Sequence, residues 1–266
     1  MGASVRNIKP GERVSSFTNF SLNDYCTHAE SVVLPERSVT KTPPNLTPEQ
    51  GASFWSAYLT AYCGVVELGR LEPSSVVLAT AGTSSVGTAA IQVVKALGAT
   101  VITTTRSREH RERLESIGAD HVVVLADEDL RDAIPDITGG RGVDIVFDAV
   151  GGAQFGNFGA IAAVGGSLIA YGVLSNELPV VPVAEIMAKN LSIDVYTLFT
   201  HTGNRHFNAE GQPEVVERAQ RFILDGIALG HLEPQVATLF EGFDRYINAT
   251  MFIEKGWSTG KVVVRL

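Results

Sequence analysis

The sequence has little cysteine, and this scarcity argues against two kinds of stabilising framework. Only Cys26 and Cys63 occur among its 266 residues. Neither belongs to a Cys-x-x-Cys pair or to a cysteine and histidine series with the spacing of zinc ligands. We therefore expect neither a disulfide framework nor a structural zinc site.

Positive charge and long apolar runs are also scarce. The chain has 21 Lys and Arg against 29 Asp and Glu, a formal charge of -8 and a pI near 5.3. Because nucleic-acid affinity rests on clustered Lys and Arg, this balance disfavours a nucleic-acid partner and favours a small molecule. No apolar run approaches the ~20 residues that a membrane-spanning helix needs, and residues 1–13 lack the apolar core of a signal peptide. We expect a cytoplasmic protein without a membrane partner.

Alternating strand and helix patterns fill the middle of the chain. Buried or alternating apolar runs predict the strands 75–80, 101–105, 121–125, 144–149 and 167–171, with 191–198 as a sixth, edge strand. Helical patterns lie between them at 86–97, 109–117 and 155–163. This order predicts an α/β fold with a parallel sheet covered on both faces.

The regions on either side of this alternating segment have a different sequence pattern. Residues 5–44 are rich in turn signals and predict short β-strands, one of them near 31–34. A helix predicted over 48–68 starts at the N-cap Thr47 with Gln50 as its capping-box partner. Later patterns predict helices at 215–224 and 243–252 and a strand at 261–266, which we interpret as a return to the first region.

A glycine-rich turn joins the strand 75–80 to the next helix and carries the chemistry. The dinucleotide-binding fingerprint is G-x-G-x-x-G, and this chain has Gly82, Ser84 and Gly87 at those positions. Such a turn places backbone N–H groups and the positive end of a helix dipole against a pyrophosphate. The hydroxyls of Ser84 and Ser85 are able to donate to a phosphate oxygen, and the turn predicts a Rossmann domain.

Arg106 stands where the second strand ends, 24 positions after Gly82. An NAD enzyme has Asp or Glu there to bind the ribose hydroxyls, whereas a guanidinium pairs with the 2′-phosphate of NADPH. The sequence therefore favours NADPH. For Arg108 and Arg111 the sequence leaves two alternatives open: contact with the cofactor, or a place on the solvated face of a helix.

Two further strand ends carry turn residues, at 148–152 and at 170–172. Because ligands of open parallel sheets lie beyond the carboxyl ends of the strands, both turns, including Val150, are expected to line the same crevice. Simple turn geometry is the alternative explanation for their glycines.

An ordered series of motifs runs along the chain. The motifs are Lys9-Pro10-Gly11-Glu12-Arg13-Val14, Leu59-Thr60-Ala61-Tyr62, the 82–87 turn, Leu97-Gly98-Ala99, Gly118-Ala119-Asp120 and Gly260-Lys261-Val262-Val263. This series resembles the medium-chain dehydrogenase/reductase superfamily, closest to its zinc-independent, quinone-oxidoreductase-like branch. The resemblance implies a Rossmann doubly wound sheet inserted in a partial GroES-like β-rich domain. Its pieces would be 1–57 (catalytic domain), 58–200 (NADPH-binding domain) and 201–266 (return to the catalytic domain).

The same resemblance implies an NADPH-dependent oxidoreductase that reduces an activated double bond or carbonyl of an enone, quinone or enoyl thioester. It places Thr60 near the nicotinamide as a catalytic candidate. The cofactor-binding residues that it implies, together with those from the strand ends, are Gly82, Ser84, Ser85, Val86, Gly87, Arg106, Ser107, Val150, Tyr171, Gly172, Phe199 and Lys261. It also makes a homodimer plausible, through the edge strand 191–198.

Two departures from the family pattern bear on activity. The cysteine and histidine ligands of the zinc-dependent branch are missing, so no metal site is expected. Family members also have a longer segment before the equivalent of Lys9. The alternative function is therefore a shortened, repurposed pseudo-reductase that acts as a non-redox biosynthetic enzyme or a nucleotide-binding partner.

The proton donor is left open by the sequence. Tyr25 is a candidate that would line the substrate cleft, with a structural tyrosine as the alternative. His28, His201 and His206 are further candidates, although isolated loop histidines are commonly surface residues. Ser84-Ser85 does not form a G-x-S-x-G elbow, which disfavours hydrolase chemistry.

Overall fold

The computed structural model describes residues 2–17, 19–256 and 258–266. The chain forms two compact units, which are described separately. One unit comprises Met1–Leu59 and Leu198–Leu266, and the other comprises Thr60–Thr197.

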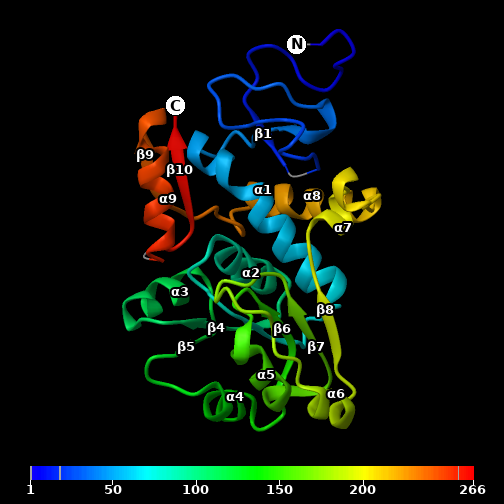
Figure 1. The fold of residues 1–266 in the computed structure, drawn as a ribbon, viewed down its shortest axis with the longest axis vertical. Helices are drawn as coiled ribbons and strands as arrows, with labels where there is room; N and C mark the ends of the chain where they lie inside the picture. The colour runs from blue at the N-terminus through cyan, green and yellow to red at the C-terminus, as the bar shows by residue number, and fades with distance from the viewer. Residues whose placement is uncertain (1, 18, 257) are drawn as a thin grey trace. The chain divides into compact units, whose positions relative to one another are not determined.

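The Thr60–Thr197 unit contains a six-stranded parallel sheet (Figure 1). Its strands are β3 (Val76–Ala79), β4 (Thr100–Thr105), β5 (His121–Val124), β6 (Val143–Asp148), β7 (Ala162–Ala170) and β8 (Ser192–Val195). They lie in the order β5-β4-β3-β6-β7-β8, and every neighbouring pair is parallel. The chain thus builds outward from β3 to one edge and then from β6 to the other. This topology confirms the predicted α/β, Rossmann-type sheet with its sixth strand at the edge.

Helices cover this sheet on both faces. They are α2 (Ser85–Ala96), α3 (Arg111–Ile117), α4 (Leu130–Thr138), α5 (Gly152–Ile161) and α6 (Val183–Lys189). On one face Leu78, Val146 and Leu168 of the sheet form a buried cluster with Ile134 of α4 and Phe155 of α5. Because side chains alternate along a strand, the neighbouring Val77, Ile145 and Phe147 face the opposite side.

The predicted helices of this unit need several corrections. The helix expected at 155–163 begins at Gly152 and ends at Ile161, because β7 already begins at Ala162. Helices α4 and α6 had no counterpart among the predictions. Pro135 lies inside α4 and argues against a helix in the sequence. The helix nevertheless forms, and the Asp129 side chain caps its N-terminus by accepting the Arg131 N–H at 2.8 Å.

The other unit begins with two short antiparallel strands, β1 (Val14–Ser16) and β2 (Val39–Lys41). The expected strand near 31–34 is absent, since those residues have no regular structure. Helix α1 (Pro48–Tyr62) follows and continues as a wider π-type segment, Cys63–Leu68. Its capping box is confirmed, because the Gln50 N–H donates to Thr47 Oγ1 at 3.2 Å and the Thr47 N–H donates to Gln50 Oε1 at 3.0 Å.

The remaining elements of this unit lie after the sheet in the chain. They are α7 (Phe199–Thr202), α8 (Pro213–Ala228), β9 (Val236–Glu241), α9 (Tyr246–Glu254) and β10 (Lys261–Arg265). Strand β9, which the sequence did not predict, pairs in parallel with β10. Asn45 Nδ2 donates to the carbonyl of Ile227 at 3.0 Å and so ties the beginning of the chain to α8. None of the helices in the described ranges has the length and apolar character needed to cross a membrane.

Candidate functional site

The carboxyl ends of β3, β4, β6 and β7 meet at one edge of the sheet, and most of the predicted cofactor-binding residues follow these four ends. The strand order reverses between β3 and β6, which is where open parallel sheets leave a crevice. The edge therefore brings together segments that the sequence separates.

The turn after β3 is held tightly against β4. Gly82 donates its N–H to the carbonyl of Thr104 at 2.9 Å, and a Cβ on Gly82 would lie 2.3 Å from Thr103 Oγ1. A Cβ on Gly87 would lie 2.4 Å from the carbonyl oxygen of Ala81. These two close approaches explain why glycine stands at both positions of the fingerprint.

Ser84 caps helix α2. Its Oγ accepts the N–H of Gly87 at 2.9 Å, while the N–H groups of Ser85 and Val86 have no hydrogen-bond acceptor among the described residues. No acidic side chain lies in the first turn of this helix. The turn therefore presents amide donors and the positive end of the helix dipole without a competing carboxylate.

A buried carboxylate ties β6 to β3. Asp148 is fully buried, and its oxygens accept hydrogen bonds from Thr80 Oγ1 at 2.7 Å and from the N–H of Gly151 at 2.7 Å. Burial raises the pKa of Asp148, and these hydrogen bonds oppose the shift only in part. The sequence had marked Asp148 only as part of a turn, because nothing in its spacing shows that Thr80 would reach it.

Three arginines follow β4, and they differ in their partners. Arg108 pairs with Asp127 at 2.5 Å and Arg111 pairs with Glu128 at 2.8 Å. Arg106 is exposed and forms no ion pair within the part of the chain that the structure describes. Of the three guanidinium groups, that of Arg106 is the one left available to an anionic ligand.

Tyr171 follows β7 and stacks on Phe147 of β6, with ring centroids 4.0 Å apart and an interplanar angle of 20°. Its hydroxyl is buried; burial and the charge of Asp148 raise the pKa of this phenol, and a hydrogen bond with Ser84 opposes the shift in part. The next residue, Gly172, lies against the turn after β6, because a Cβ there would be 2.8 Å from the carbonyl oxygen of Ala149. Val150 of that turn is half-buried.

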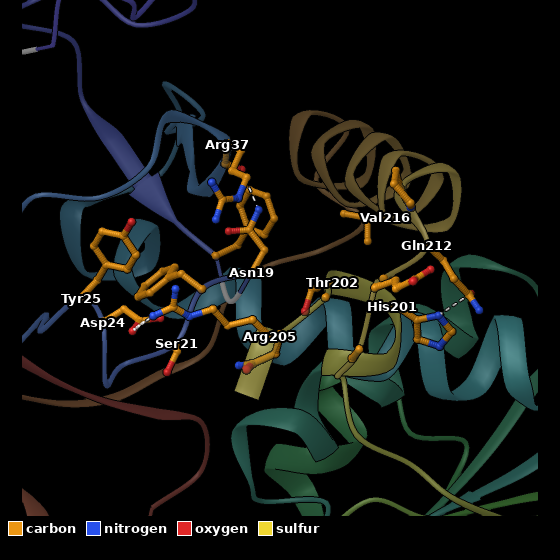
Figure 2. Close-up of a pocket in the computed structure, with 18 of the residues that line it drawn as sticks. Asn19, Ser21, Asp24, Tyr25, Arg37, His201, Thr202, Arg205, Gln212 and Val216 are labelled. Carbon is orange, nitrogen blue, oxygen red and sulfur yellow. Dashed lines mark hydrogen bonds and ion pairs between the residues drawn. The ribbon is translucent and has the colours of Figure 1, made fainter. Parts of the chain in front are cut away.

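A cavity lies entirely within the unit formed by Met1–Leu59 and Leu198–Leu266 (Figure 2). It is a cavity of about 930 Å³ between residues 17–25 and residues 201–220, with Arg37 at its wall. Tyr25 lines it and packs edge-on against Phe20, with ring centroids 6.0 Å apart. Asp24 holds Arg205 at 2.5 Å across the cavity, and this ion pair joins segments that are 181 positions apart in the chain.

The histidines of the sequence analysis divide between core and surface. His201 is buried and shares a 2.8 Å hydrogen bond with Gln212 through Nδ1, so the expectation of a surface residue is wrong for it. His206 is exposed and lies 3.3 Å from Asp24. Burial raises the pKa of Asp24, but the hydrogen bonds from Arg205 and His206 outweigh it and lower that pKa overall.

The other candidates lie apart from the sheet edge in the chain. Thr60 is a half-buried residue of α1, and Phe199 begins α7, where it stacks on Phe207 with ring centroids 5.2 Å apart. Lys261 begins β10, and burial lowers the pKa of its ammonium group. Tyr25, Phe199 and Lys261 belong to one unit, whereas Thr60 and the sheet-edge residues belong to the other.

Comparisons with known proteins identify the family. The model of the zinc-binding dehydrogenase family matches residues 85–212. A protein of Leishmania amazonensis described as a probable quinone oxidoreductase is 30% identical over the whole chain, which covers 76% of that protein. The chain belongs to the quinone-oxidoreductase-like branch of the medium-chain dehydrogenase/reductase superfamily.

Other proteins that this chain resembles differ from it in length. A phenolphthiocerol/phthiocerol polyketide synthase subunit of Mycobacterium tuberculosis is 30% identical over all of this chain, which spans only 12% of that subunit. A solved mycobacterial protein complexed with NADPH superposes with a TM-score of 0.79 at 26% identity, covering 90% of this chain and 71% of that one. Despite the family model's name, the described residues contain no group of three or more His, Cys, Asp or Glu side chains placed to hold a metal ion.

The raised pKa of Asp148 predicts a pH dependence of stability for this superfamily member. In the folded protein the Asp148 carboxyl binds its proton more tightly than in the unfolded chain, where the pKa of this carboxyl lies near 3.8. As pH rises above that value, ionisation of Asp148 should therefore lower the free energy of unfolding. Asp148→Asn removes this titration. Urea unfolding from about pH 4 to about pH 7 should show the wild type losing stability relative to the variant.

The matched control is Asp132→Asn, which removes an exposed carboxylate in the first turn of α4. Its stability difference from the wild type should not follow the Asp148 profile. A constant difference between wild type and Asp148→Asn across the interval would contradict the prediction.

Proposed function

We propose that the protein is an NADPH-dependent, zinc-independent reductase of an activated double bond or carbonyl in an enone, quinone or enoyl thioester. The observation that carries the proposal is the turn between Gly82 and Gly87. Its amide donors from Ser85 and Val86 lie on the same sheet edge as Arg106, and neither they nor that guanidinium group has a partner among the described residues. The similar mycobacterial protein that was solved in complex with NADPH supports the choice of cofactor.

The residues at the sheet edge fit a dinucleotide in two respects. The glycines let the turn approach β4 so closely that the amides of Ser85 and Val86 are free to donate to a pyrophosphate. Arg106 and Ser107 follow β4, where the 2′-phosphate of NADPH would lie. Bound NADPH would supply the hydride, and the protein would supply position and charge.

The remaining roles extend the family pattern to this chain. Val150, Tyr171 and Gly172 would line the cofactor crevice, and Thr60, Phe199 and Lys261 would lie toward the nicotinamide. Tyr25 would donate the proton that the reduced substrate needs, since its phenol lines the cavity of about 930 Å³. The mixed polar and apolar lining of that cavity suits a substrate with a carbonyl on an apolar body.

The cofactor preference should depend on Arg106. We expect the native protein to bind NADPH more tightly than NADH, and Arg106→Asp to weaken NADPH binding by about 10-fold or more because it replaces a phosphate partner with a repelling carboxylate. NADH binding should change little. Fluorescence titration of the reduced cofactors measures both dissociation constants.

Arg113→Asp is the control, because it makes the same charge change at an exposed position of helix α3. It should leave the ratio of NADPH to NADH affinity close to that of the native protein. Equal affinities of the native protein for the two cofactors would refute the NADPH assignment.

Turnover separates the reductase from the repurposed alternative. After the NADPH titration, a panel of enones, quinones and enoyl thioesters should deplete the absorbance of the reduced cofactor. Tyr25→Phe should lower kcat by about 10²-fold or more without changing the NADPH dissociation constant, because only proton donation is lost. Tyr246→Phe, in the same unit, is the matched control.

The possible results have different meanings. Tight NADPH binding without any turnover would favour a non-redox role, and the absence of binding would reject the reductase proposal. Full activity of Tyr25→Phe would be consistent with a reductase but would show that Tyr25 is a structural residue and not the proton donor.

We also propose that the protein forms a homodimer through β8. This strand ends the sheet, so one of its edges is open, and Val195, Met187 and Leu178 nearby are 85%, 81% and 83% exposed. A second copy would pair with the edge and cover the apolar side chains. Val195→Lys should shift sedimentation from dimer to monomer, whereas Val33→Lys, an equally exposed position in the other unit, should not.

A further inference from the structure

Two arginines line the cavity within the Met1–Leu59 and Leu198–Leu266 unit, and they differ in their partners. Arg205 donates to Asp24 at 2.5 Å, so the protein itself neutralises its charge. Arg37 is exposed, and its guanidinium group has no hydrogen bond, ion pair or ring contact within the described part of the chain. The N–H donors of Arg37 are therefore available to a ligand in the cavity.

The backbone around Arg37 is fixed, although its side chain is not. The carbonyl oxygen of Arg37 accepts a hydrogen bond from Asn19 Nδ2 at 2.9 Å. The side chain of the preceding residue, Glu36, accepts the N–H groups of Arg6 and Asn7, each at 2.7 Å. A ligand would thus meet a cation whose main chain is already in place, which lowers the ordering cost of binding.

Three acidic side chains also line the cavity, and an unpaired carboxylate would repel an anionic ligand. Asp24 is paired with Arg205. Glu217 of α8 lies 4.0 Å from Arg221, one helical turn further on. Glu210 is exposed and has no ion pair among the residues that the structure describes. One acid of the lining therefore keeps an unpaired charge.

Arg37 and that unpaired acid belong to different sides of the cavity. Figure 2 shows Arg37 on one side and Gln212 on the other. Glu210 and Glu217 belong to the same chain segment as Gln212. An anionic group would therefore reach the guanidinium on the side of the cavity away from that segment.

We propose that Arg37 selects substrates that carry an anionic group, a carboxylate or a phosphate, at a distance from the bond that is reduced. The proposal rests on the proposed function, because it takes this cavity, with Tyr25 on its lining, as the substrate site. A guanidinium pairs with either anion through parallel N–H bonds. A volume of about 930 Å³ has room for such a group in addition to an enone or enoyl thioester.

Arg37→Gln tests the proposal because it removes the charge and keeps a polar side chain. The probes are oxo-octanoate with its ketone beside the terminal methyl group, the methyl ester of this acid, and the phosphate monoester of the matching keto alcohol. These compounds have no activated double bond, and in the absence of NADPH their ketone is not reduced, so calorimetric titration measures binding alone.

The native protein should bind an anionic probe more tightly than the neutral ester. Arg37→Gln should lower this ratio of affinities about 5-fold or more, a size expected of an ion pair that water reaches in part. Arg37→Lys should retain part of the ratio, because it keeps the charge and loses the planar fork. The melting temperature of Arg37→Gln should equal that of the native protein, since the side chain has no contact to lose among the described residues.

The matched control is Arg245→Gln, which removes an exposed arginine of the same unit that does not line the cavity. It should leave the ratio of anion to ester affinity unchanged. An equal fall of this ratio in Arg245→Gln and in Arg37→Gln would trace the preference to the overall charge of the unit and overturn the assignment to Arg37.

The two anionic probes identify the source of the anion. Tighter binding of the acid would indicate a free carboxylate substrate, tighter binding of the phosphate would indicate a phosphorylated one, and either result supports the inference. Equal affinity of the native protein for the ester and both anions would overturn it, as would an unchanged ratio in Arg37→Gln. Selective binding of an anion without NADPH-dependent reduction of any enone, quinone or enoyl thioester would instead reject the proposed function and keep Arg37 as an anion-binding residue.

Discussion

The hydrogen bond from Thr80 to Asp148 joins β3 and β6 at the point where the strand order reverses, and the candidate site is built around it. Thr80 also accepts the N–H of Ala149 at 3.0 Å, and Asp148 accepts that of Gly151. A buried carboxylate is tolerated only when such donors surround it. The same bonds set the directions in which the chain leaves both strands, toward the glycine turn and toward the turn before α5.

At the carboxyl edge of the sheet, selectivity between NADPH and NADH would depend on which arginines are already paired with carboxylates. The backbone turn offers donors that suit the pyrophosphate of any dinucleotide, so it does not distinguish NADPH from NADH. Asp127 and Glu128, which follow β5, pair with Arg108 and Arg111 and leave Arg106 without an ion pair among the described residues. A neighbouring strand end thus decides which guanidinium group is available to a 2′-phosphate.

Local patterns predicted most of the sheet because buried parallel strands need apolar runs and their helices need an apolar face. The capping box at Thr47 and the edge strand β8 were predicted for the same local reasons. The elements that were missed had weak local signals. Helix α4 contains Pro135, and β9 is stabilised by its pairing with β10, a partner more distant in the chain.

By itself, the sequence determined the α/β architecture, the glycine turn and the place of Arg106, because each depends on short-range spacing and residue type. Tertiary structure alone decided which arginines are neutralised, that Thr80 satisfies Asp148, and that the Tyr171 ring stacks on Phe147. It also brought Asp24 to Arg205 across a cavity. Such pairings join residues far apart in the chain, and their formation depends on packing, which no local pattern encodes.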